Sequence, residues 1–153
     1  MDKNLDTRDL YLRQSELEDF RDALNEAREN LEEERAEEEP DQDNLIDLEK
    51  ELETAEFMFG DAEKEELEAL EALENEVTAY VPSESYIRGV ELIHERNLTE
   101  YVKETFYESY DGLREADESS FTLVIDWDAT ADNMRLELAE VEYAGKTYLV
   151  RIE

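Results

Sequence analysis

Apolar side chains recur at heptad spacing along the first forty positions. The stripe consists of Leu10, Leu17, Phe20, Leu24, Ala27 and Leu31. This spacing predicts an amphipathic helix with one apolar face. Thr7 is placed to cap its start, and Arg13 interrupts the stripe within the first heptad. The strongly acidic run 32–39 has no apolar stripe, so we expect it to fray or stay solvated.

A second stripe follows Pro40. It consists of Leu45, Leu48, Leu52, Ala55, Phe59 and Ala62, and helical spacing resumes at Leu67, Leu70, Leu73 and Val77. Asp43 or Asn44 is the expected N-cap. Gly60-Asp61 disturbs the phase, so either one helix continues through a weak point or Asp61 caps a third helix. A glycine inside a helix costs about 1 kcal/mol relative to alanine, and of the two possibilities we favour continuation. Helical stretches over 1–39 and 41–80 predict an antiparallel helical hairpin.

The pattern becomes mixed after Pro82. Asn97 and Glu100 have the spacing of a capping box, which predicts a helix from Leu98 to the Asp111-Gly112 pair. Residues 121–125 are apolar and extended in character. Asp126 then precedes a helical pattern over 127–138, for which it is the expected cap.

Alternating side chains over 141–150 predict a β-hairpin. Ala144-Gly145 forms its two-residue turn, and Gly145 supplies positive φ. The predicted fold class is therefore α+β. An acidic antiparallel, coiled-coil-like helical hairpin (1–80) precedes a small domain (81–153) of two helices with a short antiparallel β-hairpin or sheet.

The net charge of the chain restricts the partners that it can bind. Asp and Glu number 47 against 15 Lys and Arg, a net charge of -32, and residues 1–80 hold 30 acidic and 8 basic side chains. Such a chain repels nucleic acid and anionic membranes. It has no apolar run long enough to span a membrane, no secretory signal pattern and no cysteine. We expect a cytoplasmic location.

Little in the sequence suggests catalysis or metal binding. His94 beside Glu95 could serve as a general base, but we favour the interpretation that it is a surface or structural histidine. The string Asp126-x-Asp128-x-Thr130 resembles a calcium loop, yet Ala131 stands where such a loop needs glycine. Helix capping explains that string better. We expect no enzyme activity, no catalytic residue, no metal and no cofactor.

The density of charge on the helical stretch is its most informative property. A helix of about 32 residues is about 48 Å long, and duplex DNA carries about 28 charges over that length. The first 80 residues carry a comparable net of -22. We expect a set of carboxylates to stand in for DNA phosphates: Glu26, Glu29, Glu33, Glu37, Glu49, Glu53, Glu56, Glu63, Glu68, Asp117, Glu118, Asp128 and Asp132.

Residues 84–151 carry a family resemblance. Its strongest part is Asp126-Trp127-Asp128 followed by Ala131, Asn133 and Met134, close before the strand pair 141–151; the segments 92–95 and 98–104 add to it. In these residues the chain resembles ArdA-type antirestriction proteins and related small acidic phage and plasmid proteins. That resemblance implies a DNA mimic that inhibits restriction enzymes, typically type I systems. It covers a little under half of the chain, and an acidic hairpin stands where the family has its N-terminal domains.

The expected function is thus competitive inhibition of a DNA-binding host defence protein, such as a restriction-modification complex or a CRISPR effector. Direct nucleic-acid and membrane binding are not expected, and a homodimer would lengthen the charged surface. Two alternatives remain open: another anti-defence inhibitor such as an anti-CRISPR protein, or a coiled-coil scaffold from a high-salt cytoplasm. The low lysine count, 5 against 10 arginines, suits the latter.

Overall fold

The computed structural model describes residues 2–119 and 123–153. They form seven α-helices, one 3-10 turn and a four-stranded antiparallel sheet, so the α+β fold class is confirmed. The chain divides into two compact units, Leu10–Ala72 and a second made of Met1–Asp9 with Leu73–Glu153. The boundary after Ala72 differs from the expected one at 80/81, and the residues before Leu10 group with the sheet.

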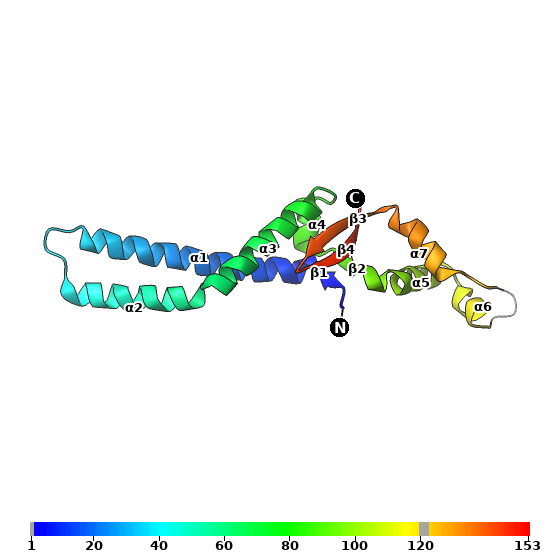
Figure 1. Cartoon of the computed structure of the whole chain (residues 1–153), viewed down its shortest axis with the longest axis horizontal. Coiled ribbons are helices and arrows are strands. Elements are labelled where there is room, and N and C mark those ends of the chain that lie inside the picture. Colours follow the sequence, from blue (N-terminus) through cyan, green and yellow to red (C-terminus); the bar gives the residue numbers. More distant parts are fainter. Residues whose placement is uncertain (1, 120–122) are drawn as a thin grey trace. The chain divides into compact units, whose positions relative to one another are not determined.

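The first unit is a helical hairpin. Helix α1 (Thr7–Arg35) leads into a short turn, and α2 (Gln42–Met58) returns beside it in the opposite direction (Figure 1). Leu17, Leu24, Ala27 and Leu31 of the α1 stripe are buried, as their spacing predicts. Asp41, rather than Asp43 or Asn44, caps α2: its side chain accepts hydrogen bonds from the backbone N–H groups of those two residues.

The expectation of one continuous second helix is wrong. Helix α2 ends at Met58, Phe59 leaves helical geometry at φ -128° and ψ 74°, and α3 (Asp61–Thr78) begins two residues later. Asp61 is the first residue of α3, and the carbonyl of Gly60 accepts the hydrogen bond from Lys64 N. Phe59 is buried at the break. Burial of this ring therefore accompanies the change of direction.

The sheet of the second unit has the strand order β1-β2-β4-β3, formed by β1 (Leu5–Asp6), β2 (Glu91–His94), β3 (Leu138–Tyr143) and β4 (Lys146–Arg151). Neighbouring strands are antiparallel, with Ile93 opposite Leu149 and Val141 opposite Tyr148. The predicted hairpin over 141–150 is confirmed, and its first strand starts three residues earlier. Strands β1 and β2 were not anticipated.

Helices cover the sheet. Helices α5 (Leu98–Ser109) and α7 (Trp127–Arg135) share a core cluster with Ile93 of β2 and Leu149 of β4. At the β3 edge, the Glu76 carboxylate near the end of α3 accepts a hydrogen bond from Glu142 N at 3.4 Å. Helices α4 (Ser83–Arg88) and α6 (Leu113–Ser119) are short and were not expected.

Several local expectations need correction. Thr7 does not cap α1; its buried hydroxyl donates to Tyr86 O and accepts from Val90 N, both at 2.7 Å, while Asp6 accepts from Arg8 N. Asn97 makes no capping bond, because its amide donates instead to Asp2 O and to the Asn4 side chain.

The segment around the last helix also departs from expectation. Helix α7 ends at Arg135, and Leu138 already belongs to β3. Residues 123–125 lie in no strand, and the remainder of the expected strand, 121–122, lies outside the described residues. The cap is confirmed, since the Asp126 side chain accepts from Ala129 N at 3.1 Å.

Candidate functional site

Exposed carboxylates follow the solvent side of α1. Glu26, Glu29 and Glu33 are spaced three and four residues apart, so they share one helix face. With about 3.6 residues per turn, that face is opposite the buried Leu24 and Leu31. All three glutamates are exposed, as is Glu37 just beyond the end of α1. The stripe that folds the helix therefore also orients its acidic face.

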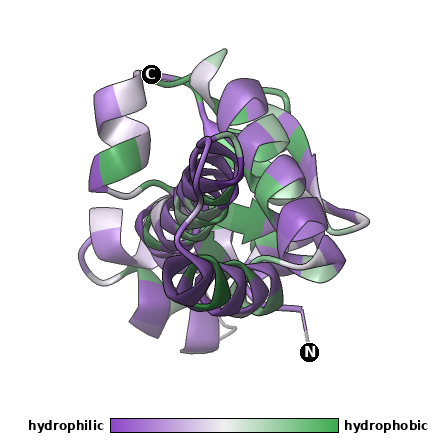
Figure 2. Cartoon of the chain, turned by 90° about the vertical axis from the view of Figure 1, so that its left-hand side faces the viewer, coloured by the Kyte–Doolittle hydropathy of each residue, from purple (hydrophilic) through white to green (hydrophobic). Residues whose placement is uncertain are grey.

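The returning helices continue this surface. Glu49, Glu53 and Glu56 repeat the same spacing along α2 and are exposed. In α3, Glu68 is exposed and Glu63 is half-buried. Figure 2 shows hydrophilic residues along the outer sides of the hairpin helices. We call the exposed carboxylates of residues 10–72 the carboxylate surface.

Few of these acids have a cationic partner. Residues 10–72 contain 25 acidic and 6 basic side chains. Only five of the 25 carboxylates form ion pairs among the described residues: Glu16 and Glu66 with Arg13, Asp22 and Glu71 with Arg21, and Glu49 with Arg35. The Arg13 guanidinium lowers the pKa of Glu66 by hydrogen bonding. The remaining 20 carboxylates form no ion pair among the described residues, and 17 of them are exposed.

The acids expected in the second unit have different environments. Glu118 and Asp132 are exposed, and Asp128 accepts a hydrogen bond from the Thr99 hydroxyl at 3.1 Å. Asp117 is half-buried and accepts from the Tyr107 hydroxyl and from the Trp127 indole N–H, the latter at 2.9 Å. The Tyr107 hydrogen bond, followed by that of Trp127, lowers the pKa of Asp117. In turn, Asp117 raises the pKa of Tyr107 to about 12. Asp117 therefore holds an aromatic cluster together.

His94, the only histidine, is 4 % exposed and sits in β2. Its Nδ1 accepts a hydrogen bond from Arg96 N at 3.1 Å, so in the neutral ring the proton is on Nε2, which lies 3.6 Å from Asp2 Oδ1. The ring also meets Tyr148 edge-on, with centroids 5.4 Å apart. Glu95 turns away and pairs with Arg135 at 3.4 Å. These contacts place His94 in the sheet core, where it orders the turn after β2.

Metal-type side chains do not converge in the part of the chain that the structure describes: no three His, Asp or Glu side chains there are placed to hold an ion. The calcium-like string is divided between a cap and a helix. Asp126 caps α7, and Asp128 of that helix accepts a hydrogen bond from Thr99.

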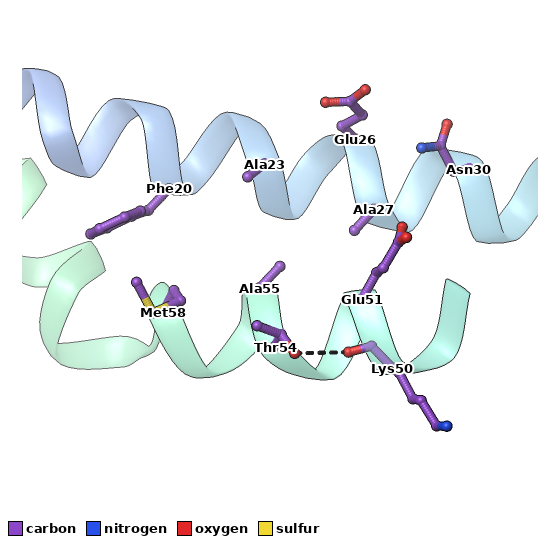
Figure 3. Close-up of a pocket in the computed structure, with 10 residues that line it drawn as sticks. All are labelled: Phe20, Ala23, Glu26, Ala27, Asn30, Lys50, Glu51, Thr54, Ala55 and Met58. Carbon is purple, nitrogen blue, oxygen red and sulfur yellow. Dashed lines mark hydrogen bonds between the residues drawn. The ribbon is translucent and has the colours of Figure 1, made fainter. Parts of the chain in front are cut away.

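A groove along the helical hairpin was not apparent from the sequence. It runs between α1 and α2 and encloses about 620 Å³. Its apolar walls are Phe20, Ala23, Ala27, Ala55 and Met58, with Glu26, Asn30, Lys50, Glu51 and Thr54 around them (Figure 3). The available signal was the alanines on and beside the heptad stripe, which leave space where leucines would fill it.

Comparison with known proteins gives no relative: no family model matches the chain, and no curated protein or solved structure does. The resemblance to antirestriction proteins therefore stays a prediction. Within the described residues, no helix combines the length and apolar character that crossing a membrane requires.

Proposed function

We propose that this chain is a non-enzymatic, cytoplasmic DNA mimic that inhibits a DNA-binding host defence protein. One observation carries the proposal: of the 25 carboxylates in residues 10–72, five form ion pairs among the described residues and most of the others are exposed. Unpaired like charges disfavour the folded hairpin. A partner that neutralises them explains why they are kept on a regular helical scaffold.

The physical basis is electrostatic competition. A basic DNA-binding groove attracts any rigid surface with closely spaced negative charges, and complementary charge speeds association. Binding of the carboxylate surface excludes DNA from that groove. Each exposed pair contributes little on its own, about 0–1 kcal/mol. Affinity should therefore be spread over many glutamates, with no single decisive residue.

The target class follows from the resemblance in residues 84–151. We propose a type I restriction-modification complex as the first target and a CRISPR effector as the next. The inhibitor makes no direct nucleic-acid or membrane contact. A homodimer would extend the carboxylate surface.

The test is a displacement assay. A type I restriction-modification complex is held on labelled duplex DNA, and the full chain is titrated in at about 50 mM and about 200 mM salt. We expect displacement that weakens steeply with salt, because phosphate mimicry depends on charge. Absence of displacement at both salt concentrations would remove this target class and favour the scaffold alternative.

A matched pair of variants separates surface geometry from net charge. The first carries Glu26→Gln, Glu29→Gln and Glu33→Gln, all on one face of α1. The second changes three exposed acids of the other unit by the same total charge: Glu84→Gln, Glu108→Gln and Glu115→Gln. We expect a larger loss of displacement from the first variant. Equal losses would show that overall charge alone is responsible.

A further inference from the structure

The apolar stripe of α2 is only partly covered. No residue of α2 is buried, and Leu45, Leu48, Leu52 and Ala55 are all half-buried. In most helices the tertiary packing of the apolar face supplies the stability. The α1 stripe, in contrast, has four buried residues. The hairpin unit therefore has unused apolar surface on its α2 side.

Ala55 of this stripe lines the groove between α1 and α2, where further apolar side chains join it. Phe20 and Met58 face each other at one end, and Ala23, Ala27 and Ala55 lie along it (Figure 3). Met58 is 43 % exposed and Ala23 is exposed. Helices pack at about 8–10 Å between axes, and the distance depends on the side chains at the contact. Three alanines provide the room for a third helix to lie in the groove.

The rim of the groove is acidic. Glu26 and Glu51 line it directly, while Asp19 and Glu33 lie one heptad to either side of Glu26. Figure 3 shows Glu51 reaching toward Ala27, whereas the Lys50 ammonium extends away from α1.

The arginines of α1 are directed elsewhere. Arg21 pairs with Glu71 of α3, and Arg35 pairs with Glu49. Arg28 is seven residues from each of these arginines, so it shares their side of the helix. The arginines therefore leave the rim charge uncompensated.

We propose that this groove binds a cationic amphipathic helix of a partner protein. Apolar side chains of that helix fill the space between Phe20 and Met58, and its lysines or arginines meet Glu26 and Glu51. A second copy of this chain fits the rim less well, because each hairpin unit has a net charge of -19 from 25 acidic and 6 basic residues. The proposal differs from DNA mimicry in requiring the apolar groove, although Glu26 and Glu51 at its rim also belong to the carboxylate surface.

The experiment uses the full chain and a fluorescent designed peptide of about 18 residues, about 27 Å as a helix. The peptide has leucines on one face and lysines on the other. The control peptide has the same composition with the leucines scattered. We expect anisotropy to show tighter binding of the amphipathic peptide. Ala23→Lys should weaken that binding about tenfold or more, because it places a long cation in the groove.

Asn25→Lys is the matched control. It adds the same charge to the same helix at an exposed position on the other side of α1, next to Arg21 and Arg28. Circular dichroism checks that both variants keep their helices.

Two results would overturn the proposal. One is equal binding of the two peptides or equal weakening by the two variants, which would mean attraction by charge alone. The other is a wild-type dimer in sedimentation that Ala23→Lys separates, which would mean that a second copy covers the groove. The DNA-displacement assay reports separately on mimicry.

Discussion

At the scale of single residues, identical carboxylates have different roles according to their neighbours. Glu26 and Glu29 are exposed and form no ion pair among the described residues, whereas Asp117 is bound by Tyr107 and Trp127. All three were expected to mimic phosphates. The sequence could not distinguish them, because the distinction depends on aromatic side chains of α5 and α7 that meet the carboxylate of α6.

The Asp117 interaction makes a pH-dependent contribution to stability. Its pKa in the folded protein is lowered from the ordinary 3.8, chiefly by the Tyr107 hydrogen bond. The stabilisation is therefore fully present above 3.8 and is lost as the pH falls through the lower folded value. We expect Asp117→Asn to lower the melting temperature at pH 7, and the difference from wild type to shrink below pH 3.8.

Fluorescence of Trp127, the only tryptophan, reports unfolding at this site. Glu118→Gln is the control, because Glu118 is exposed beside Asp117. A difference between Asp117→Asn and wild type that stays constant down to pH 2 would contradict the assignment.

At the scale of elements, heptad spacing predicted both hairpin helices, and alternation predicted the β3–β4 pair. These patterns are local and repeat several times. Strand β1 has only two residues and exists because Leu5 pairs with Leu92, which no local pattern shows. The prediction that Asn97 caps a helix was wrong because of similarly distant partners. Its side chain is hydrogen-bonded to Asp2 and Asn4. Long-range partners decided the elements that sequence reasoning missed.

The β3–β4 turn offers a direct test at this scale. Both turn residues have positive φ, 52° at Ala144 and 74° at Gly145, and such turns favour asparagine followed by glycine. Left-handed geometry costs alanine roughly 1–2 kcal/mol. We expect Ala144→Asn to raise the free energy of unfolding in urea by about 0.5–1 kcal/mol. Ala144→Val should lower it, since a β-branched side chain tolerates this conformation poorly. The opposite order would show that turn strain is absent.

At the scale of the whole molecule, charge repulsion opposes folding. The net charge is -32, and most acids of the hairpin unit form no ion pair among the described residues. The screening length shortens from about 30 Å at 0.01 M salt to about 3 Å at 1 M. We therefore expect the melting temperature to rise steadily with sodium chloride over this range.

The triple variant Glu26→Gln, Glu29→Gln, Glu33→Gln should start from a higher melting temperature and respond less to salt. Both proteins are compared by calorimetry in the same buffers. A melting temperature independent of salt would mean that the carboxylates are too far apart to repel one another.

The hairpin unit interrupts the sequence of the sheet unit, because residues 10–72 separate β1 from β2, the strand with which it pairs. This topology has a consequence for how the chain folds. Arg13 and Glu66 are 2.9 Å apart once the helices have formed, so the long excursion between Leu5 and Leu92 is already closed over most of its length. Closing a short remaining loop costs less entropy than closing a long one. The formed hairpin thus brings the segments that pair as β1 and β2 closer together. Whole helical turns can be added to or removed from its far end without altering a single residue of the sheet.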